Sequence, residues 1–326
     1  MATLPEPLLI ESEERFTFFP IEKPNLYNLY KNSLAVFWQV EEIDFAKDRR
    51  DWEEKLTDNE RYFIKCILGF FSSADGLIIE NLASRFMKEV QISEARAFYA
   101  IQIAMEQIHS ETYSLMIDTF ILDKQERIDT LQSIRTNKAV EKKARWALKW
   151  MSSDASFALR LIAFAIVEGV FFSGAFASIY WLKERGLMPG LTLSNQFIAR
   201  DEGIHTDFAV ALYRQEVVNR IPQETIDEIF REAVEVEKYF ITEALPVNLI
   251  GMNCTLMQQY IEFVCDRLMY QLGYNKMFKT ENPFSWMEKI SMEKKGNFFE
   301  TRISEYAKAG VGKTKEEMSF SLDADF

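Results

Sequence analysis

Residues 93–120 read SEARAFYAIQIAMEQIHSETYSLMIDTF, without one glycine or proline. Apolar side chains recur in this stretch every three or four residues, which is the period of an α-helix that buries one face. Ser93 is a candidate N-cap, because a serine hydroxyl accepts hydrogen bonds from the first N–H groups of a helix. The stretch therefore predicts a long helix with one face in the core.

Helical patterns of the same kind lie on both sides of this stretch. Residues 59–86 read NERYFIKCILGFFSSADGLIIENLASRF, with Thr57 or Asp58 as the candidate cap, and residues 140–151 continue the pattern. Period-two runs and Asn-Gly or Asp-Gly turns are few, so strands are not expected. The pattern predicts an all-α fold.

The placement of proline agrees with long helices. No proline occurs between Pro24 and Pro189. Because a proline inside a helix costs about 3 kcal/mol, this interval permits several uninterrupted helices. We expect turns near residues 184–189 and 220–222.

Composition limits the class of protein. The chain has 326 residues, and its 27 phenylalanines rule out disorder for most of it. A net charge of −12 argues against a protein whose main role is binding nucleic acid. Cys66, Cys254 and Cys265 are widely spaced and odd in number, which favours a reducing, cytoplasmic location. We read no secretion or organelle signal in the acids and prolines of the N-terminus.

One segment imitates a membrane span. Residues 161–182, LIAFAIVEGVFFSGAFASIYWL, are long enough to cross a bilayer and hold a single charge, Glu168. The alternative is a helix that is apolar all round because it lies at the centre of a large bundle. A lone glutamate in lipid is costly, and no other such run occurs, so the central helix is preferred.

A short motif occurs twice and involves both histidines of the chain. His109 follows Glu106 by three residues, and His205 follows Glu202 by three. Helical residues three apart share a face, so each pair can hold one metal ion. The alternative for each motif alone is a solvated glutamate beside a surface or core histidine. The apolar surroundings of both copies favour the metal site.

Two metals need further carboxylates. A di-metal helical bundle takes one carboxylate from each of two helices and a Glu-x-x-His motif from each of two others. Asp75 and Glu168 precede the two motifs by about one long helix each. A helix-cap role for Asp75, with Glu80 as its competitor, stays open. Glu168 is the stronger candidate, because an unpaired carboxylate in an apolar run would protonate or cost several kcal/mol.

Helical spacing adds a phenol and a possible apolar wall. Tyr113 lies four residues after His109, on the same face, and is either a core tyrosine or a one-electron donor. Phe172, Phe176 and Ile198 lie one or two turns from Glu168 or Glu202. They are either ordinary core residues or the walls of a dry pocket around the phenol.

The C-terminal residues differ from the rest. Residues 309–326, AGVGKTKEEMSFSLDADF, are rich in glycine and charge, as a frayed terminus often is. Phe320, Leu322 and Phe326 are nevertheless apolar side chains in an acidic peptide, a pattern suited to docking in a groove of a partner.

Taken together, these segments resemble the small, radical-generating subunit of ribonucleotide reductase, of the eukaryotic and large-virus type. The resemblance covers nearly the whole chain, and it is carried by FWQVEEIDFAKD, GFFSSADGLIIENL, QIAMEQIHSETYSLMID, IVEGVFFSG, ARDEGIHTDFA and FSLDADF. It implies a ferritin-like bundle in residues 31–308, an N-terminal segment in 1–30 and a docking tail in 309–326. It also implies a homodimer and a large catalytic subunit as partner.

The resemblance assigns roles to named residues. It implies two iron ions per chain in an oxo-bridged pair, with manganese as the alternative, held by Asp75, Glu106, His109, Glu168, Glu202 and His205. It implies that this centre and O₂ generate a stable radical on Tyr113, inside a pocket of Phe172, Phe176 and Ile198. Transfer toward the large subunit, where ribonucleotides become deoxyribonucleotides, would use Trp38, Asp201, His109 and Tyr306.

Two other functions remain as alternatives. One is another ferritin-like di-iron oxidase, such as a ferroxidase or an oxygenase, for which a substrate tunnel to the metals would speak. The other is an iron-storage or structural helical protein, which needs neither a radical nor a partner. Tyr113, Trp38 and the docking tail favour the reductase subunit.

Overall fold

The computed structural model describes residues 5–151, 154–244 and 247–285. The chain divides into two units, Met1–Pro283 and Phe284–Phe326, and the first holds every element described below. Tyr306, Phe320, Leu322 and Phe326 lie outside the described residues. The predicted boundaries at residues 30 and 308 stay predictions, although a helix, Pro24–Val36, crosses the first of them.

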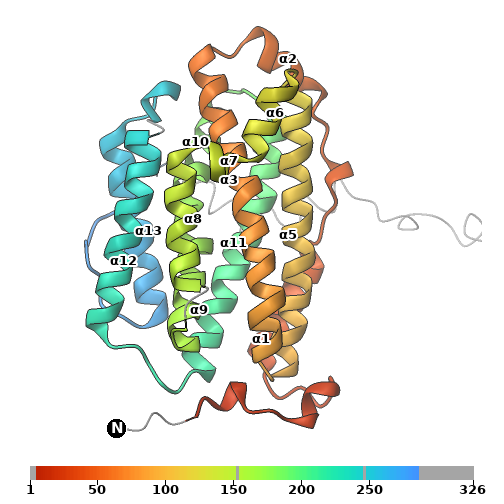
Figure 1. The fold of residues 1–326 in the computed structure, drawn as a ribbon, viewed down its shortest axis with the longest axis vertical. Coiled ribbons are helices and arrows are strands. Elements are labelled where there is room, and N and C mark those ends of the chain that lie inside the picture. Colours follow the sequence, from red (N-terminus) through yellow and green to blue (C-terminus); the bar gives the residue numbers. More distant parts are fainter. Residues whose placement is uncertain (1–4, 152–153, 245–246, 286–326) are drawn as a thin grey trace, which may run out of the picture. The chain divides into compact units, whose positions relative to one another are not determined.

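The described residues form helices and no strand, which confirms the all-α prediction. The principal helices are α1 (Pro24–Val36), α2 (Ala46–Glu54), α3 (Asp58–Asn81), α5 (Ser93–Phe120), α6 (Lys124–Leu131), α8 (Lys138–Met151), α9 (Phe157–Ile166), α10 (Ser173–Glu184), α11 (Pro189–Glu216), α12 (Gln223–Lys238) and α13 (Cys254–Leu272). Short helices α4 (Met87–Glu89) and α7 (Ser133–Thr136) lie between them. Figure 1 shows the long helices running side by side.

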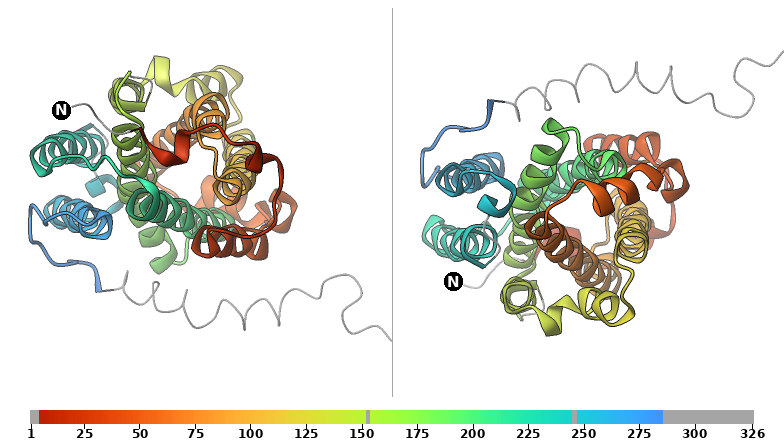
Figure 2. Two further views of the ribbon diagram at one scale, coloured as in Figure 1. Left: turned by 90° about the horizontal axis from the view of Figure 1, so that it is seen from below. Right: turned by 90° about the horizontal axis from the view of Figure 1, so that it is seen from above.

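Three single turns of π-helix follow or join the α-helices. They are η4 (Leu82–Phe86), η5 (Val167–Phe171) and η6 (Tyr239–Ala244). The turn η5 joins α9 to α10, so these three segments form one continuous rod. The end-on views of Figure 2 show α12 and α13 side by side at one edge of the bundle. Such π-turns often occur at functional sites.

Local sequence explains where α3 begins, but not where α5 begins. Thr57 caps α3: its hydroxyl accepts from the N–H of Glu60, whose carboxylate accepts from the Thr57 N–H. The prediction of Ser93 as the N-cap of α5 was wrong, because Ile92 holds that position and Ser93 is already helical. The Ser93 hydroxyl instead donates to Glu94, whose other oxygen accepts two backbone N–H groups of residues 22 and 23.

Residues 161–182, the apolar run predicted to form a central helix, lie within the helical rod Phe157–Glu184. Phe157–Glu184 has the length and composition of a membrane span, but 94% of its most apolar window is buried inside the protein. The expectation that it was the only such run was wrong. Asp58–Glu89 passes the same test, with 56% of its window buried. Phe157–Glu184 is enclosed by other helices and needs no polar face, whereas Asp58–Glu89 is enclosed on only part of its surface.

Candidate metal centre

Six buried side chains from four rods meet inside the bundle. α5 supplies one Glu-x-x-His pair and α11 supplies the other, while α3 and η5 supply one carboxylate each. Each of the six is at most 2% exposed: Asp75, Glu106, His109, Glu168, Glu202 and His205. They form two groups that share Glu106, and the candidate ligand atoms within each group lie within 4.8 Å of one another. All six predicted ligands are thus brought together, while the competitor Glu80 is exposed on α3.

The distances between the two motifs show how tightly the site is built. His205 Nδ1 lies 2.9 Å from Glu106 Oε1 and 3.1 Å from Glu202 Oε2. His109 Nδ1 lies 3.2 Å from Glu202 Oε1 and 3.4 Å from Glu106 Oε2. Each glutamate therefore faces both imidazoles, and the two Glu-x-x-His motifs form one site.

The donor atoms of this site fit two divalent cations. Buried atoms that make no hydrogen bond of good geometry include both carboxylate oxygens of Asp75 and Glu106, and Nδ1 of His109, although those of Glu106 and His109 lie within ion-pair distance of other members of the site. One carboxylate oxygen of Glu168 and one of Glu202 also make no such hydrogen bond. Unsatisfied polar atoms are rare in a protein interior, and metal coordination satisfies them. Four carboxylates also balance the charge of two divalent cations, and mixed oxygen and imidazole donors suit iron or manganese.

Burial and mutual repulsion favour the protonated form of two of the carboxyl groups in the absence of a cation. Burial raises the pKa of Asp75 well above its usual range, and the charge of Glu106 raises it further. Burial likewise raises the pKa of Glu168, together with the charges of Glu202 and Glu106. A divalent cation that enters the site must displace these protons.

The pKa values of two further members, His205 and Glu202, are shifted toward the charged form of each group. Burial acts to lower the pKa of His205, but the carboxylates of Glu106 and Glu202 outweigh it and raise the value to about 9. Burial acts to raise the pKa of Glu202, but a hydrogen bond with Glu168 and the charge of His205 outweigh it, so the pKa is lowered. The metal-free site is therefore a cluster of shared protons.

Glu168 is presented by the π-turn η5. Gln102 Nε2 on α5 donates to its Oε1 at 3.2 Å, and its Oε2 lies 3.9 Å from His205 Nδ1, inside the site. Gln102 lies four residues before Glu106, on the same helical face. That spacing was available in the sequence, but Gln102 was not predicted, because a glutamine does not mark a metal site.

A polar chain leads away from His109. Its Nε2–H donates to Asp201 Oδ2 at 3.1 Å, and the indole Nε1–H of Trp38 donates to the same oxygen at 2.8 Å. Arg200 binds the other carboxylate oxygen at 2.8 Å. A carboxylate on Nε2 sets the imidazole tautomer and leaves Nδ1 free to bind a metal. The structure thus brings together the three residues Trp38, Asp201 and His109.

Tyr113 lies beside the centre in apolar surroundings. Its side chain is 2% exposed and its hydroxyl has no hydrogen bond. Burial raises the pKa of this phenol well above its usual value, and the charge of Asp75 adds to the effect, so the group is neutral. The ring of Phe71 stacks on it with centroids 4.7 Å apart.

Phe71 joins this phenol to the predicted apolar wall. It also stacks on Phe172 at 5.5 Å and lies 5.4 Å from Phe176. Ile198, the third predicted wall residue, is fully buried on α11. Phe71 was not predicted, although it lies four residues before Asp75 on the same face of α3.

Comparison with known proteins agrees with this site. The family model described as "Ribonucleotide reductase, small chain" matches residues 15–283. The ribonucleoside-diphosphate reductase small chain of Trypanosoma brucei brucei is 55% identical over 322 residues, which cover 98% of this chain and 95% of the relative. Subunit M2 of the ribonucleoside-diphosphate reductase of Homo sapiens is 56% identical over 322 residues, with 98% and 82% covered.

Comparison of the fold with solved structures points to the same family. The Rnr4 homodimer of ribonucleotide reductase from Saccharomyces cerevisiae has been solved, and its chain matches with a TM-score of 0.80 at 38% identity. The match covers 92% of each chain. The likeness confirms the predicted ferritin-like helical bundle with a carboxylate and histidine cluster in its core.

Proposed function

The chain belongs to the ribonucleotide reductase small-chain family, and from this premise we propose that it is the radical-generating subunit of a ribonucleoside-diphosphate reductase. The observation that carries the proposal is a buried phenol, Tyr113, beside a six-ligand site with orphaned donor atoms. A storage protein needs the ligands but has no use for that phenol. Tyr113 therefore favours the reductase over the alternatives.

We propose two iron ions as the resident metals, with manganese as the alternative. Asp75, Glu106 and His109 would hold one ion, and Glu168, Glu202 and His205 the other, with Glu106 within reach of both. When bound, such a pair supplies the oxidising chemistry with O₂ that no protein side chain can perform. The chain supplies the ligands, their orientation and the exclusion of water.

Tyr113 would provide the electron and the proton that the oxidised centre takes up. Burial raises the pKa of this phenol, so it would keep its proton until it gives up the electron, and the proton would then pass to a nearby group of the centre. Asp75 is the carboxylate whose charge acts most strongly on this phenol, which makes it the candidate acceptor. A neutral tyrosyl radical persists where reductants cannot reach, and Phe71, Phe172 and Phe176 would supply that barrier.

The radical would leave the site through the polar chain. Trp38 and His109 share one oxygen of Asp201, so a proton can shift between indole, carboxylate and imidazole when an electron passes. Tyr306, which lies outside the described residues, would continue the route toward the large subunit. The substrate pocket belongs to that subunit, and this agrees with a sequence that contains no phosphate-binding loop.

We further propose that the acidic tail, with Phe320, Leu322 and Phe326, docks on the large subunit, and that the chain acts as a cytoplasmic homodimer. A relative of known structure is a homodimer. The proposal is tested by adding the iron-loaded chain to the large subunit of a ribonucleotide reductase and measuring reduction of a nucleoside diphosphate. Turnover that needs both chains supports it. A chain that binds metal but never supports turnover with a competent large subunit contradicts it.

A further inference from the structure

A buried ion pair outside the metal centre joins α8 to α12. Lys143 Nζ lies 2.6 Å from Glu237 Oε2, and the two side chains are 1% and 0% exposed. The ammonium lies over the rings of Phe70 and Phe240, at 3.7 and 4.0 Å from their centroids. Taking two charges out of water costs free energy that their attraction often fails to return. Stability alone therefore does not account for the pair.

The same ammonium also holds the backbone of the π-turn. Lys143 Nζ donates to the carbonyl oxygen of Phe171 at 2.6 Å. Phe171 is the last residue of η5, three residues after Glu168 and one before Phe172. One hydrogen bond thus fixes the chain between a metal ligand and a ring of the wall around Tyr113.

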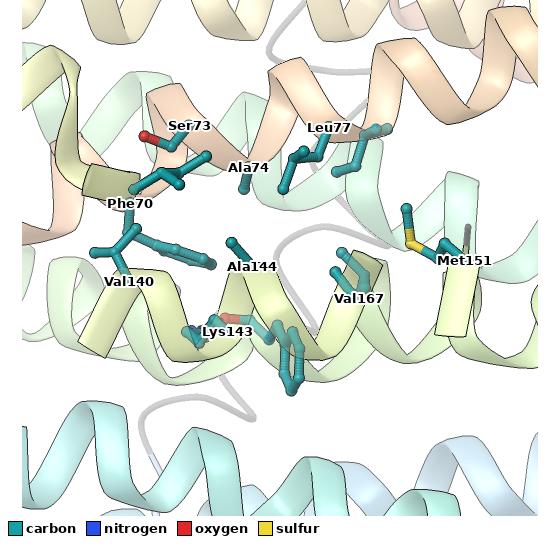
Figure 3. A pocket seen from close by; sticks show the side chains of 13 residues that line it. Phe70, Ser73, Ala74, Leu77, Val140, Lys143, Ala144, Met151 and Val167 are labelled. Carbon is teal, nitrogen blue, oxygen red and sulfur yellow. Dashed lines mark hydrogen bonds between the residues drawn. The ribbon is translucent and has the colours of Figure 1, made fainter. Parts of the chain in front are cut away.

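Apart from the Phe171 carbonyl and Glu237, the groups around the Lys143 ammonium are mostly apolar. An apolar cavity of about 20 Å³ adjoins it between α3, α8 and η5. Figure 3 shows Lys143 and Val167 on one side of this cavity, facing Ala74 and Leu77 of α3. A cavity of this volume holds one water-sized molecule, and apolar walls favour leaving it dry. The carbonyl and the carboxylate are therefore the partners that matter.

Gly174 in the first turn of α10 makes room for the carboxylate. A Cβ atom at this position would lie 2.7 Å from Glu237 Oε1, closer than real contacts allow. A larger residue would push the carboxylate away from Lys143. By contrast, a Cβ at Gly76 of α3 meets nothing within 4 Å.

We propose that the Lys143–Glu237 ion pair positions Glu168 for metal binding by anchoring the π-turn through the Phe171 carbonyl. The pair is a positioning device, since it touches neither a candidate metal ligand nor Tyr113 directly. The inference rests on the proposed function, in which Glu168 is a ligand. It assigns to two residues of the outer helices a role in the centre that their place in the sequence does not suggest.

The test replaces both charges together. In the full-length apoprotein, K143M/E237L leaves no unpaired charge and keeps apolar volume, so the thermal midpoint is expected to change little. The control K238M/E262L removes a neighbouring ion pair, between α12 and α13, that does not touch η5. Titration with Co²⁺ then reports the number of ions bound, their affinity and the visible spectrum of the site.

We expect K143M/E237L to lower the affinity of one of two Co²⁺ ions by about 10–100-fold and to change its spectrum, as loss of a supporting contact does. The control should match the wild type. Two ions with wild-type affinity and spectrum in K143M/E237L would overturn the inference. A wild-type chain that binds no pair of ions would instead contradict the proposed function.

A second, milder variant decides the question if K143M/E237L fails to fold. G174A displaces Glu237 without removing a charge, and G76A is its matched control. Weaker Co²⁺ binding in G174A alone supports the inference. Equal binding in G174A, G76A and the wild type rejects it.

Discussion

The indole N–H of Trp38 and the carboxylate of Asp201 lie 2.8 Å apart, although 163 residues separate them in the chain. The same oxygen of Asp201 accepts from His109, a candidate metal ligand. The indole is 4% exposed, so this contact forms inside the protein. It is the link by which the proposed metal centre reaches a residue outside its own ligands.

Replacing this indole separates radical formation from radical use. Trp38→Phe removes the N–H donor and keeps an aromatic ring, so we expect normal metal content and a normal tyrosyl radical. Reduction of nucleoside diphosphates with the large subunit should fall to background. Trp52→Phe, a buried tryptophan that stacks on Phe120, is the control and should stay active. Full turnover by Trp38→Phe would remove Trp38 from the route.

The proposed role of Glu168 as a metal ligand can be measured. Glu168→Ala removes one donor from the group of Glu106, Glu168, Glu202 and His205. Metal content should therefore fall from two ions per chain to about one or fewer. The rise of the thermal midpoint on metal addition should shrink with it, because a ligand stabilises the folded state only as far as it binds. Glu80→Ala removes an exposed carboxylate and serves as control. Unaltered metal content in Glu168→Ala would refute the assignment.

The six candidate ligands could be brought together from sequence because helical spacing determines which side chains share a face. Spacing pointed to the two Glu-x-x-His motifs, and the apolar surroundings singled out Glu168. Phe71 and Gln102 follow the same spacing and were missed because neither residue type marks a metal site. The all-α class was predictable from the gap in prolines and the helical period, whereas the ferritin-like bundle was implied by the family resemblance.

Other features depend on tertiary contacts that no local pattern contains. The π-turn that presents Glu168 has no signature in its sequence, and its anchor Lys143 reads as one of several lysines in an amphipathic helix. The start of α5 shows the same limit. Ser93 has the right type for a cap, but a contact with Glu94, itself bound to residues 22 and 23, places it inside the helix.

Stability without metal should depend on pH in a defined direction. Asp75, Glu168 and His205 all have a raised pKa in the folded chain, so the folded state binds more protons than the unfolded state. The free energy of unfolding should then fall as pH rises toward about 9. The lowered pKa of Glu202 acts the other way only below about pH 4. Burial lowers the pKa of Lys143 to about 8, so this group offsets part of the fall between about pH 8 and about pH 9.

This prediction is checked with thermal unfolding of the apoprotein in chelator, at about pH 6 and about pH 9. The midpoint should be higher at the lower pH. Stabilisation by added Mn²⁺ should show the reverse order, because the metal must displace the same protons. An apoprotein midpoint that rises across this interval would contradict the shared-proton description of the site.

The tail can be removed without touching the centre. Deleting residues 320–326 should leave metal content and the radical unchanged while association with the large subunit, measured by sedimentation or light scattering, is lost. A peptide of these seven residues should compete with the intact chain. Wild-type turnover by the shortened chain would show that docking lies elsewhere.

The most direct test of the central claim is electron paramagnetic resonance after Fe²⁺ and O₂ are added to apoprotein, with metal per chain quantified in the same samples. The wild type should bind about two ions per chain and give a tyrosyl radical signal, as the six-ligand site and the buried phenol predict. Tyr113→Phe should bind the same metal and give none. An undiminished radical in Tyr113→Phe, or a wild type that fills with iron and yields no radical, would contradict the account.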